Sequence, residues 1–127
     1  MSHTRLILSK LASPFKGKIT ISPLKTHLCN LTENELKIIN IKTHEEKTIQ
    51  NVKDFICVLL GKNEGVVYYT SKLIMFYSFT NGETRITDSL KNENLILHAT
   101  QDGFIVCIFR PYRNDTIYYN SLGDNYV

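Results

Sequence analysis

The segment Arg110-Pro111-Tyr112-Arg113 combines the side chains best suited to molecular recognition. Tyrosine and arginine are enriched where proteins bind one another, because each buries a large area and keeps a polar group for hydrogen bonding. Pro111 favours extended geometry at Arg110 and has no amide hydrogen to donate to a sheet, so the segment should be a loop after a strand. We therefore predict that Arg110, Tyr112 and Arg113 contact a partner protein.

A second candidate for recognition is the basic N-terminal end of the chain. Residues 1–32 contain five Lys and Arg side chains and no acid, whereas residues 33–127 contain ten basic and twelve acidic side chains. Clustered cations attract phosphate regardless of base sequence, so this end could bind nucleic acid. The contacts in that case would be Arg5, Lys10, Lys16 and Lys18. A solvated tail leading into the first strand and a targeting presequence are the other interpretations.

Residues that could perform catalysis or hold a metal do not form a recognisable set. Gly61-Lys62 lacks the glycine-rich loop and the following Ser or Thr of a phosphate-binding loop. His27 and Cys29 are spaced as neighbours on one face of a strand and could bind zinc with a third ligand, either His44 or His98. Zinc sites normally have a second close pair of ligands, which is missing from the sequence. We therefore expect no metal, no cofactor, no small-molecule substrate and no enzymatic activity.

Cysteine usage and hydropathy favour an intracellular protein. The three cysteines are an odd number in apolar segments, which favours core packing in a reducing compartment over a disulfide framework. Apolar runs such as 55–60 are far shorter than the roughly 20 residues that span a bilayer. The N-terminal sequence also lacks the pattern of a secretion signal. We expect a cytoplasmic or nuclear protein without a membrane partner.

The elements that must position these residues are short β-strands. The apolar segments are short and rich in β-branched or aromatic residues, and none is long enough to favour a helix. The expected strands are 18–22, 36–41, 55–60, 66–69, 73–79, 95–97, 104–109 and 116–119. Asn81-Gly82 and Asp102-Gly103 are hairpin signals, because both central positions of the mirror-image turn need a positive φ. The sequence therefore predicts an all-β, antiparallel fold.

An internal repeat of 38 residues organises these strands. Segment 14–51 aligns with segment 52–89 without a gap, and apolar positions fall on apolar positions, as where Leu36 meets Ile74. A period near 40 with four short strands per unit is typical of β-propeller blades.

A shorter third copy follows the two full repeats. It spans 90–122 and aligns when Thr100 replaces Thr70 and Ile105 replaces Ile74, which leaves about one strand missing or irregular. The expected organisation is a basic segment 1–13, one β domain 14–122 made of repeats 14–51, 52–89 and 90–122, and a tail 123–127.

The third expected strand of each full repeat has a pattern shared with a known family. Residues 36–41 and 74–79 are similar to the third strand of WD-repeat blades, where apolar positions surround an aromatic residue and an aspartate. Residues 99–105 are similar to the Ser-Asp-Asp-Gly turn that precedes this strand in the family. Over residues 14–122 the chain therefore resembles the WD-repeat β-propellers, although it contains no Trp.

The resemblance implies antiparallel four-stranded blades that act as a non-catalytic scaffold and present loops to partner proteins in a larger assembly. Asn40, Ser78 and Phe109 stand where the family has Asp, so the hydrogen-bonded tetrad that braces a typical blade is reduced to Thr100 and Asp102. The alternative is a nucleic-acid-associated scaffold, such as a propeller of ribosomal RNA processing, whose possible RNA partner would contact the basic N-terminal end.

The number of repeats leaves the architecture open. Closed propellers usually have four to eight blades, and this sequence supplies at most three. The chain could be a fragment of a longer propeller, or another protein chain could complete its ring. Alternatively, its strands could form a compact β-sandwich or barrel, because an open arc leaves sheet edges exposed.

Overall fold

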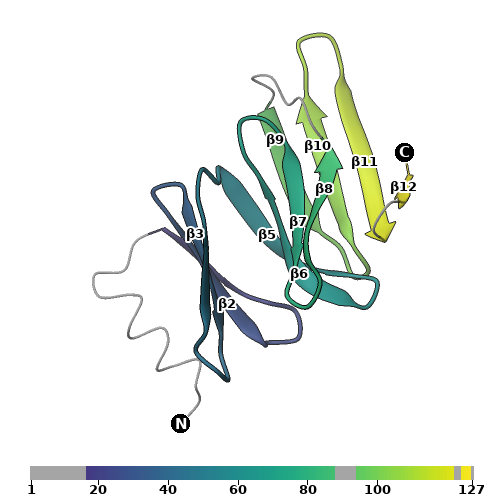
Figure 1. Ribbon diagram of the computed structural model, residues 1–127. Coiled ribbons are helices and arrows are strands. Elements are labelled where there is room, and N and C mark those ends of the chain that lie inside the picture. The colour runs from purple at the N-terminus through teal and green to yellow at the C-terminus, as the bar shows by residue number, and fades with distance from the viewer. Residues whose placement is uncertain (1–16, 88–93, 122–123, 127) are drawn as a thin grey trace.

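The structure, a computed structural model, describes residues 17–87, 94–121 and 124–126 as three antiparallel sheets of four strands each (Figure 1). The first sheet contains β1 (Lys18–Ile21), β2 (His27–Thr32), β3 (Glu35–Asn40) and β4 (Glu46–Ile49). The second contains β5 (Asp54–Leu60), β6 (Asn63–Tyr69), β7 (Ile74–Ser78) and β8 (Gly82–Thr87). The third contains β9 (Asn94–Ala99), β10 (Phe104–Phe109), β11 (Asn114–Ser121) and β12 (Asp124–Tyr126). The predicted all-β, antiparallel fold is confirmed.

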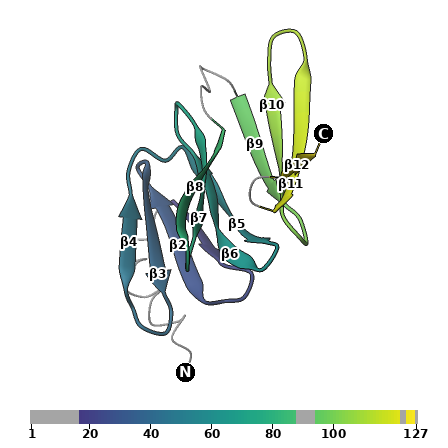
Figure 2. The same cartoon turned by 45° about the vertical axis from the view of Figure 1, so that its right-hand side comes forward.

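The three sheets stack face to face in chain order, with the second sheet between the other two (Figure 1, Figure 2). Within each sheet the spatial order of the strands is their order in the chain. The first strands of successive sheets lie beside one another, since β1 contacts β5 and β5 contacts β9. The described strands form three open sheets, so a closed barrel, one form of the expected alternative of a compact β-sandwich or barrel, is wrong for this part of the chain. Among the described residues there is no helix that could span a membrane.

Strand β5 of the middle sheet contributes side chains to the interfaces with both neighbouring sheets. Its sequence from Phe55 to Leu60 is apolar at every position, as expected for a strand covered on both faces. Phe55 and Cys57 pack toward the first sheet, whereas Val58 and Leu60 pack toward the third. Burying both faces removes nearly all of this apolar surface from water, which makes β5 the centre of the stack.

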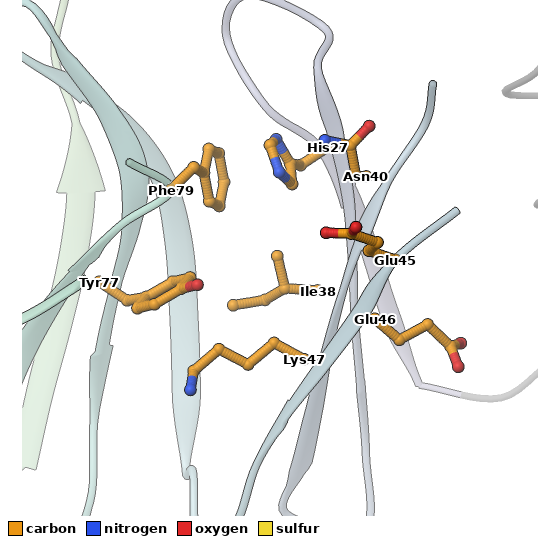
Figure 3. A pocket seen from close by; sticks show the side chains of 8 residues that line it. All are labelled: His27, Ile38, Asn40, Glu45, Glu46, Lys47, Tyr77 and Phe79. Carbon is orange, nitrogen blue, oxygen red and sulfur yellow. The ribbon is translucent and has the colours of Figure 1, made fainter. Parts of the chain in front are cut away.

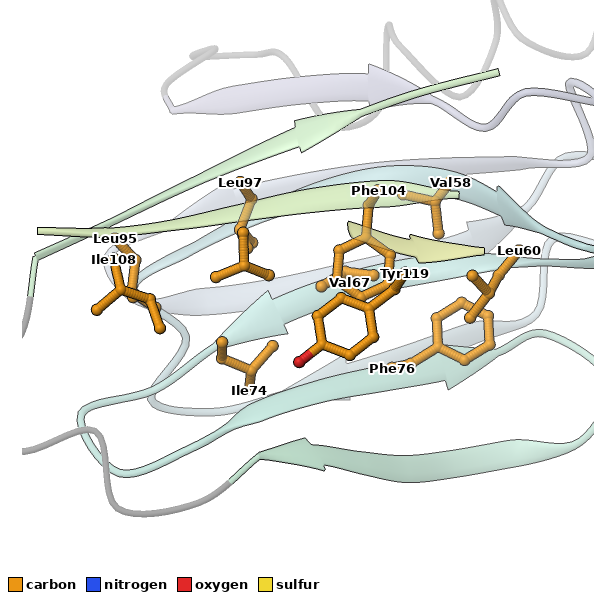
Figure 4. Close-up of a cluster of buried hydrophobic side chains, with 11 residues drawn as sticks. Val58, Leu60, Val67, Ile74, Phe76, Leu95, Leu97, Phe104, Ile108 and Tyr119 are labelled. Carbon is orange, nitrogen blue, oxygen red and sulfur yellow. The ribbon is translucent and has the colours of Figure 1, made fainter. Parts of the chain in front are cut away.

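Two separate apolar cores hold the sheets together. The first interface, between the first and second sheets, consists of Cys29, Leu36, Ile38, Val52, Phe55, Cys57, Val66 and Tyr68. The second interface, between the second and third sheets, consists of Val58, Leu60, Val67, Ile74, Phe76, Leu95, Leu97, Phe104, Val106, Ile108 and Tyr119 (Figure 4). Phe104 and Tyr119 are cross-strand partners whose rings stack with centroids 4.8 Å apart.

The 38-residue shift relates the first two sheets strand by strand. Adding 38 to the bounds of β1 gives residues 56–59, which lie within β5, and adding 38 to β4 gives 84–87, which lie within β8. The turns 32–35 and 70–73 also correspond, each joining the second and third strands of its sheet.

Asn40 and Ser78 show the same correspondence in their hydrogen bonds. The Asn40 side-chain oxygen accepts from the backbone amides of Lys42 and Thr43, both at 2.9 Å. Thirty-eight residues later, Ser78 Oγ accepts from the amides of Thr80 and Asn81, at 3.3 and 3.1 Å. Each side chain thus fixes the turn after the third strand of its sheet.

The third sheet differs from the expected third copy by one strand. The alignment of Ile105 with Ile74 makes β10 a third strand, but β9 lies against β5 and is therefore the first strand of its sheet. The turn that contains Thr100 and Asp102 accordingly joins the first and second strands. Short apolar strands resemble one another too closely in sequence to distinguish these two alignments. The sheet is completed by β12, formed by part of the segment expected to be a tail.

The two predicted mirror-image turns are also different in the structure. Gly82 has a positive φ of 87°, but the φ of Asn81 is not positive. Neither Asp102 nor Gly103 has a positive φ. The two-residue mirror-image turn occurs instead at Glu33 and Asn34, with φ of 51° and 67°. The loop 100–103 is longer and is closed by a hydrogen bond from the Thr100 amide to the Gly103 carbonyl at 3.0 Å.

Candidate interaction surfaces

The predicted recognition loop is the turn between β10 and β11. The amide of Arg110 donates to the carbonyl of Arg113 at 3.0 Å, which closes the turn and places Pro111 and Tyr112 at its tip. Tyr112 is 98% exposed, more than any other large hydrophobic side chain described. An exposed aromatic ring on a closed turn can bind a partner with little loss of backbone freedom.

Asp115 positions both arginines of this loop. Its carboxylate pairs with the guanidinium of Arg110 and lies 3.3 Å from Nε of Arg113. The Arg113 side chain nevertheless stays 73% exposed, so it can reach a second acceptor. Because Asp115 neutralises one of the two charges, the loop presents one net positive charge beside Tyr112.

The four residues expected to contact nucleic acid are largely beyond the described residues, because Arg5, Lys10 and Lys16 precede residue 17. Lys18 is described and has protein partners. Its ammonium group lies 3.0 Å from Asp54, donates to the carbonyl of Phe55 and lies 4.7 Å from the centre of the Phe55 ring. These contacts join β1 to β5, so Lys18 ties the first sheet to the second.

The residues considered as zinc ligands occupy other environments. The His27 ring stacks on Phe79 with centroids 3.7 Å apart. The Cys29 thiol is buried beside Cys57, and their hydrogen bond together with burial raises the pKa of Cys29. In the ranges that the structure describes, no group of three or more His, Cys, Asp or Glu side chains could hold a metal ion.

A cleft of about 290 Å³ opens between the first and second sheets beyond the first interface (Figure 3). It is lined by His27, Ile38, Asn40, Glu45, Glu46, Lys47, Tyr77 and Phe79. The Lys47 ammonium lies 5.2 Å from the centre of the Tyr77 ring, which is a cation–π distance. Figure 3 shows that Lys47 and Glu45 extend toward the second sheet, whereas Glu46 points away.

Polar contacts join the first and second sheets beside His27, one of the residues that line this cleft. Glu64 of β6 accepts from the Leu24 amide at 2.7 Å and from the hydroxyl of Thr26, which also lies 2.7 Å from Nδ1 of His27. Burial lowers the pKa of His27, and the carboxylate of Glu64 opposes this effect. No local sequence pattern predicts this cleft, because His27 and Phe79 meet only when two sheets pack.

The outward side of the third sheet combines apolar and uncharged polar residues. Leu95 and Leu97 point into the second interface, so alternation places Ile96 and His98 on the other side. Strand pairing adds their neighbours, and we call this surface the open face: Asn94, Ile96, His98, Ile105, Cys107, Phe109, Asn114, Thr116 and Tyr118. Ile96 is 54% exposed and Phe109 is 39% exposed.

Tyr118 connects the open face to the loop 100–103. Its hydroxyl donates to Asp102, and this hydrogen bond raises the pKa of Tyr118. Asp102 also accepts from the hydroxyl of Thr100 at 3.3 Å. The two residues expected to remain from the WD-repeat tetrad therefore bind a tyrosine from β11, and the contact joins β11 to the turn between β9 and β10.

Comparisons with known proteins give a likeness in structure alone. The sequence matches no protein-family model and no curated protein. Among solved structures, the "Crystal structure of the eukaryotic initiation factor" superposes on 87% of this chain with a TM-score of 0.57 and 13% sequence identity. The chain spans 31% of the length of that protein. At this identity the likeness shows a shared arrangement of strands.

Proposed function

We propose that the chain is a non-catalytic protein-interaction module, in which three propeller-like blades form a scaffold within a larger assembly. Each sheet is a four-stranded meander, the usual form of a propeller blade. The contacts of β1 with β5 and of β5 with β9 fit blades whose first strands lie nearest a common axis. The structural likeness to part of a longer chain also supports this proposal.

The observation that carries the interaction role is the exposure of Tyr112. A large aromatic side chain at the tip of a turn exposes apolar surface to water. A partner that covers the ring removes this surface from water, which stabilises the complex. The neighbouring Arg113 guanidinium remains 73% exposed and supplies directional donors for a carbonyl or carboxylate. The partner proposed for this loop is therefore a protein surface with an apolar depression next to an acceptor group.

A crosslinking experiment tests this role. A photoreactive phenylalanine analogue replaces Tyr112 in the full chain, and a matched chain has the analogue at Lys72, which is exposed on the turn between β6 and β7. We expect one protein to be crosslinked from position 112 and not from position 72. The double change Tyr112→Ala and Arg113→Ala should then abolish capture of that protein without lowering the melting temperature.

Two results would contradict the proposal. Equal crosslinking from both positions would show that the loop has no specific partner. Capture that disappears after nuclease treatment, or that weakens steeply between low and moderate salt, would instead identify nucleic acid as the partner.

A further inference from the structure

The cleft between the first and second sheets has an aromatic wall. The rings of His27 and Phe79 stack with centroids 3.7 Å apart, and the Tyr77 ring meets Phe79 edge-on at 6.1 Å and 70°. Two parallel rings and a third across them form what we call the aromatic corner: His27, Tyr77 and Phe79. Ile38, which is buried, extends from β3 toward Tyr77 and adds an apolar contact (Figure 3). A flat group that enters this corner would lie against ring faces and edges.

Glu45 brings a carboxylate to the other side of the cleft. Its backbone is held in the turn after β3, because its amide donates to Thr43 Oγ at 3.3 Å and its carbonyl accepts from the Asn40 amide at 2.9 Å. Its side chain extends toward the second sheet (Figure 3). Within the described chain, no residue pairs with this carboxylate or donates to it. A ligand would therefore meet an acceptor that the fold does not use.

The charges around the cleft favour a cationic occupant. Glu45 and Glu46 are among the residues that line it. Glu83 is the strand partner of Tyr77, and burial followed by the carboxylate of Glu83 raises the pKa of Tyr77. Among the described lining residues, Lys47 is the only lysine or arginine. An incoming cation thus meets more carboxylates than ammonium groups, and it is attracted more strongly here than in open water.

Lys47 shows that a cation can bind to the aromatic corner. Its ammonium group lies 5.2 Å from the centre of the Tyr77 ring, while Glu45 stays unpaired among the described residues. A guanidinium group suits the remaining positions better than a second ammonium group, because it is planar. One of its faces can stack on an aromatic ring while its edge donates two parallel hydrogen bonds to a carboxylate.

We propose that this cleft binds an arginine side chain of a partner protein, with the guanidinium group between the Glu45 carboxylate and the aromatic corner. The volume of about 290 Å³ fits one side chain, since pockets for small molecules are typically about 300 to 1,000 Å³. The inference rests on the proposed protein-interaction role. The cleft belongs to the first two sheets and the Tyr112 loop to the third, so the two surfaces can be tested separately.

The first test titrates the full chain with N-acetylarginine amide and follows the ring signals of His27, Tyr77 and Phe79 by NMR. The matched ligand is N-acetylcitrulline amide, which has the same shape without the charge. We expect saturable shifts with the arginine compound and none with the citrulline compound. Equal binding of both, no saturable shift with arginine, or equally tight binding of N-acetyllysine amide would overturn the proposal. This titration needs no partner protein, so its outcome is independent of crosslinking from Tyr112.

The second test uses two neighbouring glutamates whose side chains point in different directions (Figure 3). Glu45→Gln should weaken binding of the arginine compound about tenfold, because the charge-assisted hydrogen bonds are lost. Glu46→Gln is the matched control and should change binding less than about twofold at physiological salt, because its side chain points away. Lys47→Gln should strengthen binding, because it removes a competing cation. Equal weakening by both glutamate changes, or weakening by Lys47→Gln, would overturn the proposal, and unchanged melting temperatures would show that the variants are folded.

Discussion

The two interfaces between the sheets are built in different ways. The second interface consists of aliphatic and aromatic side chains from both sheets, including the fully buried Phe76 and Phe104. The first interface has an apolar centre as well, but polar contacts lie beside it: Lys18 with Asp54, and Thr26 with Glu64. Apolar packing is non-directional, whereas ion pairs and hydrogen bonds fix position. The third sheet is therefore held mainly by burial, and the first by burial together with directional contacts.

Phe76→Ala should have the largest effect. Phe76 is fully buried in the second interface, and losing an aromatic ring from a core typically costs about 3 to 5 kcal/mol. Denaturant unfolding followed by circular dichroism measures the change. Phe55→Ala removes the same ring from the first interface and provides the comparison. An unchanged unfolding midpoint for Phe76→Ala would contradict the central role of burial between the second and third sheets.

Gly65→Ala should come next, because β6 approaches its neighbour closely. A Cβ atom on Gly65 would lie 2.1 Å from the carbonyl oxygen of Tyr77 and 2.9 Å from the Phe76 ring. Overpacking of this kind typically costs about 1 to 3 kcal/mol. A control is Gly82→Ala, which meets no atom within 4 Å but has a φ of 87° that alanine adopts with strain. Greater destabilisation by Gly82→Ala would show that backbone conformation matters more here than contact between strands.

Thr26→Val should have a smaller effect, confined to the first interface. The change keeps the shape of the side chain and removes the hydroxyl that donates to Glu64. A hydrogen bond of this kind contributes about 1 kcal/mol. Thr48→Val on the exposed strand β4 is a matched control that should be neutral. If the two changes altered the free energy of unfolding equally, the hydrogen bond between Thr26 and Glu64 would not stabilise the fold.

The smallest expected effect is a dependence of stability on pH through His27. Burial lowers the pKa of His27 below its ordinary value of 6.5, so the unfolded chain binds a proton more readily than the folded chain. Stability should therefore fall as the pH drops below about 6.5. The change in melting temperature between pH 7.5 and pH 5.5 should be smaller in His27→Gln. An equal change in both proteins would show that other groups govern the acid response.

Sequence patterns were sufficient for the fold class because most strands are short apolar runs. The strand Phe104–Phe109 was predicted with its observed bounds, and Leu36 and Ile74 are buried on corresponding strands. The strand β4 was harder to predict, since Glu46, Lys47 and Thr48 are exposed and give no apolar signal.

Some candidate surfaces can be predicted from neighbouring residues, whereas others depend on contacts between residues far apart in the sequence. Pro111 beside Tyr112 predicted an exposed loop from neighbouring residues alone, and the structure shows that loop. The cleft at His27 and the open face at Ile96 depend on how sheets stack, which no local pattern contains. The role of Lys18 was missed for the same reason, because its partner Asp54 is 36 residues away.

Each sheet consists of four consecutive strands, which keeps its contacts local in the sequence. Every strand pairs with its neighbour in the sequence, so each sheet closes through short loops, with a low entropic cost of bringing its ends together. Folding rates rise as contacting residues come closer in sequence. The contacts within each sheet are therefore quick to form, and only the packing of one sheet on the next joins distant parts of the chain.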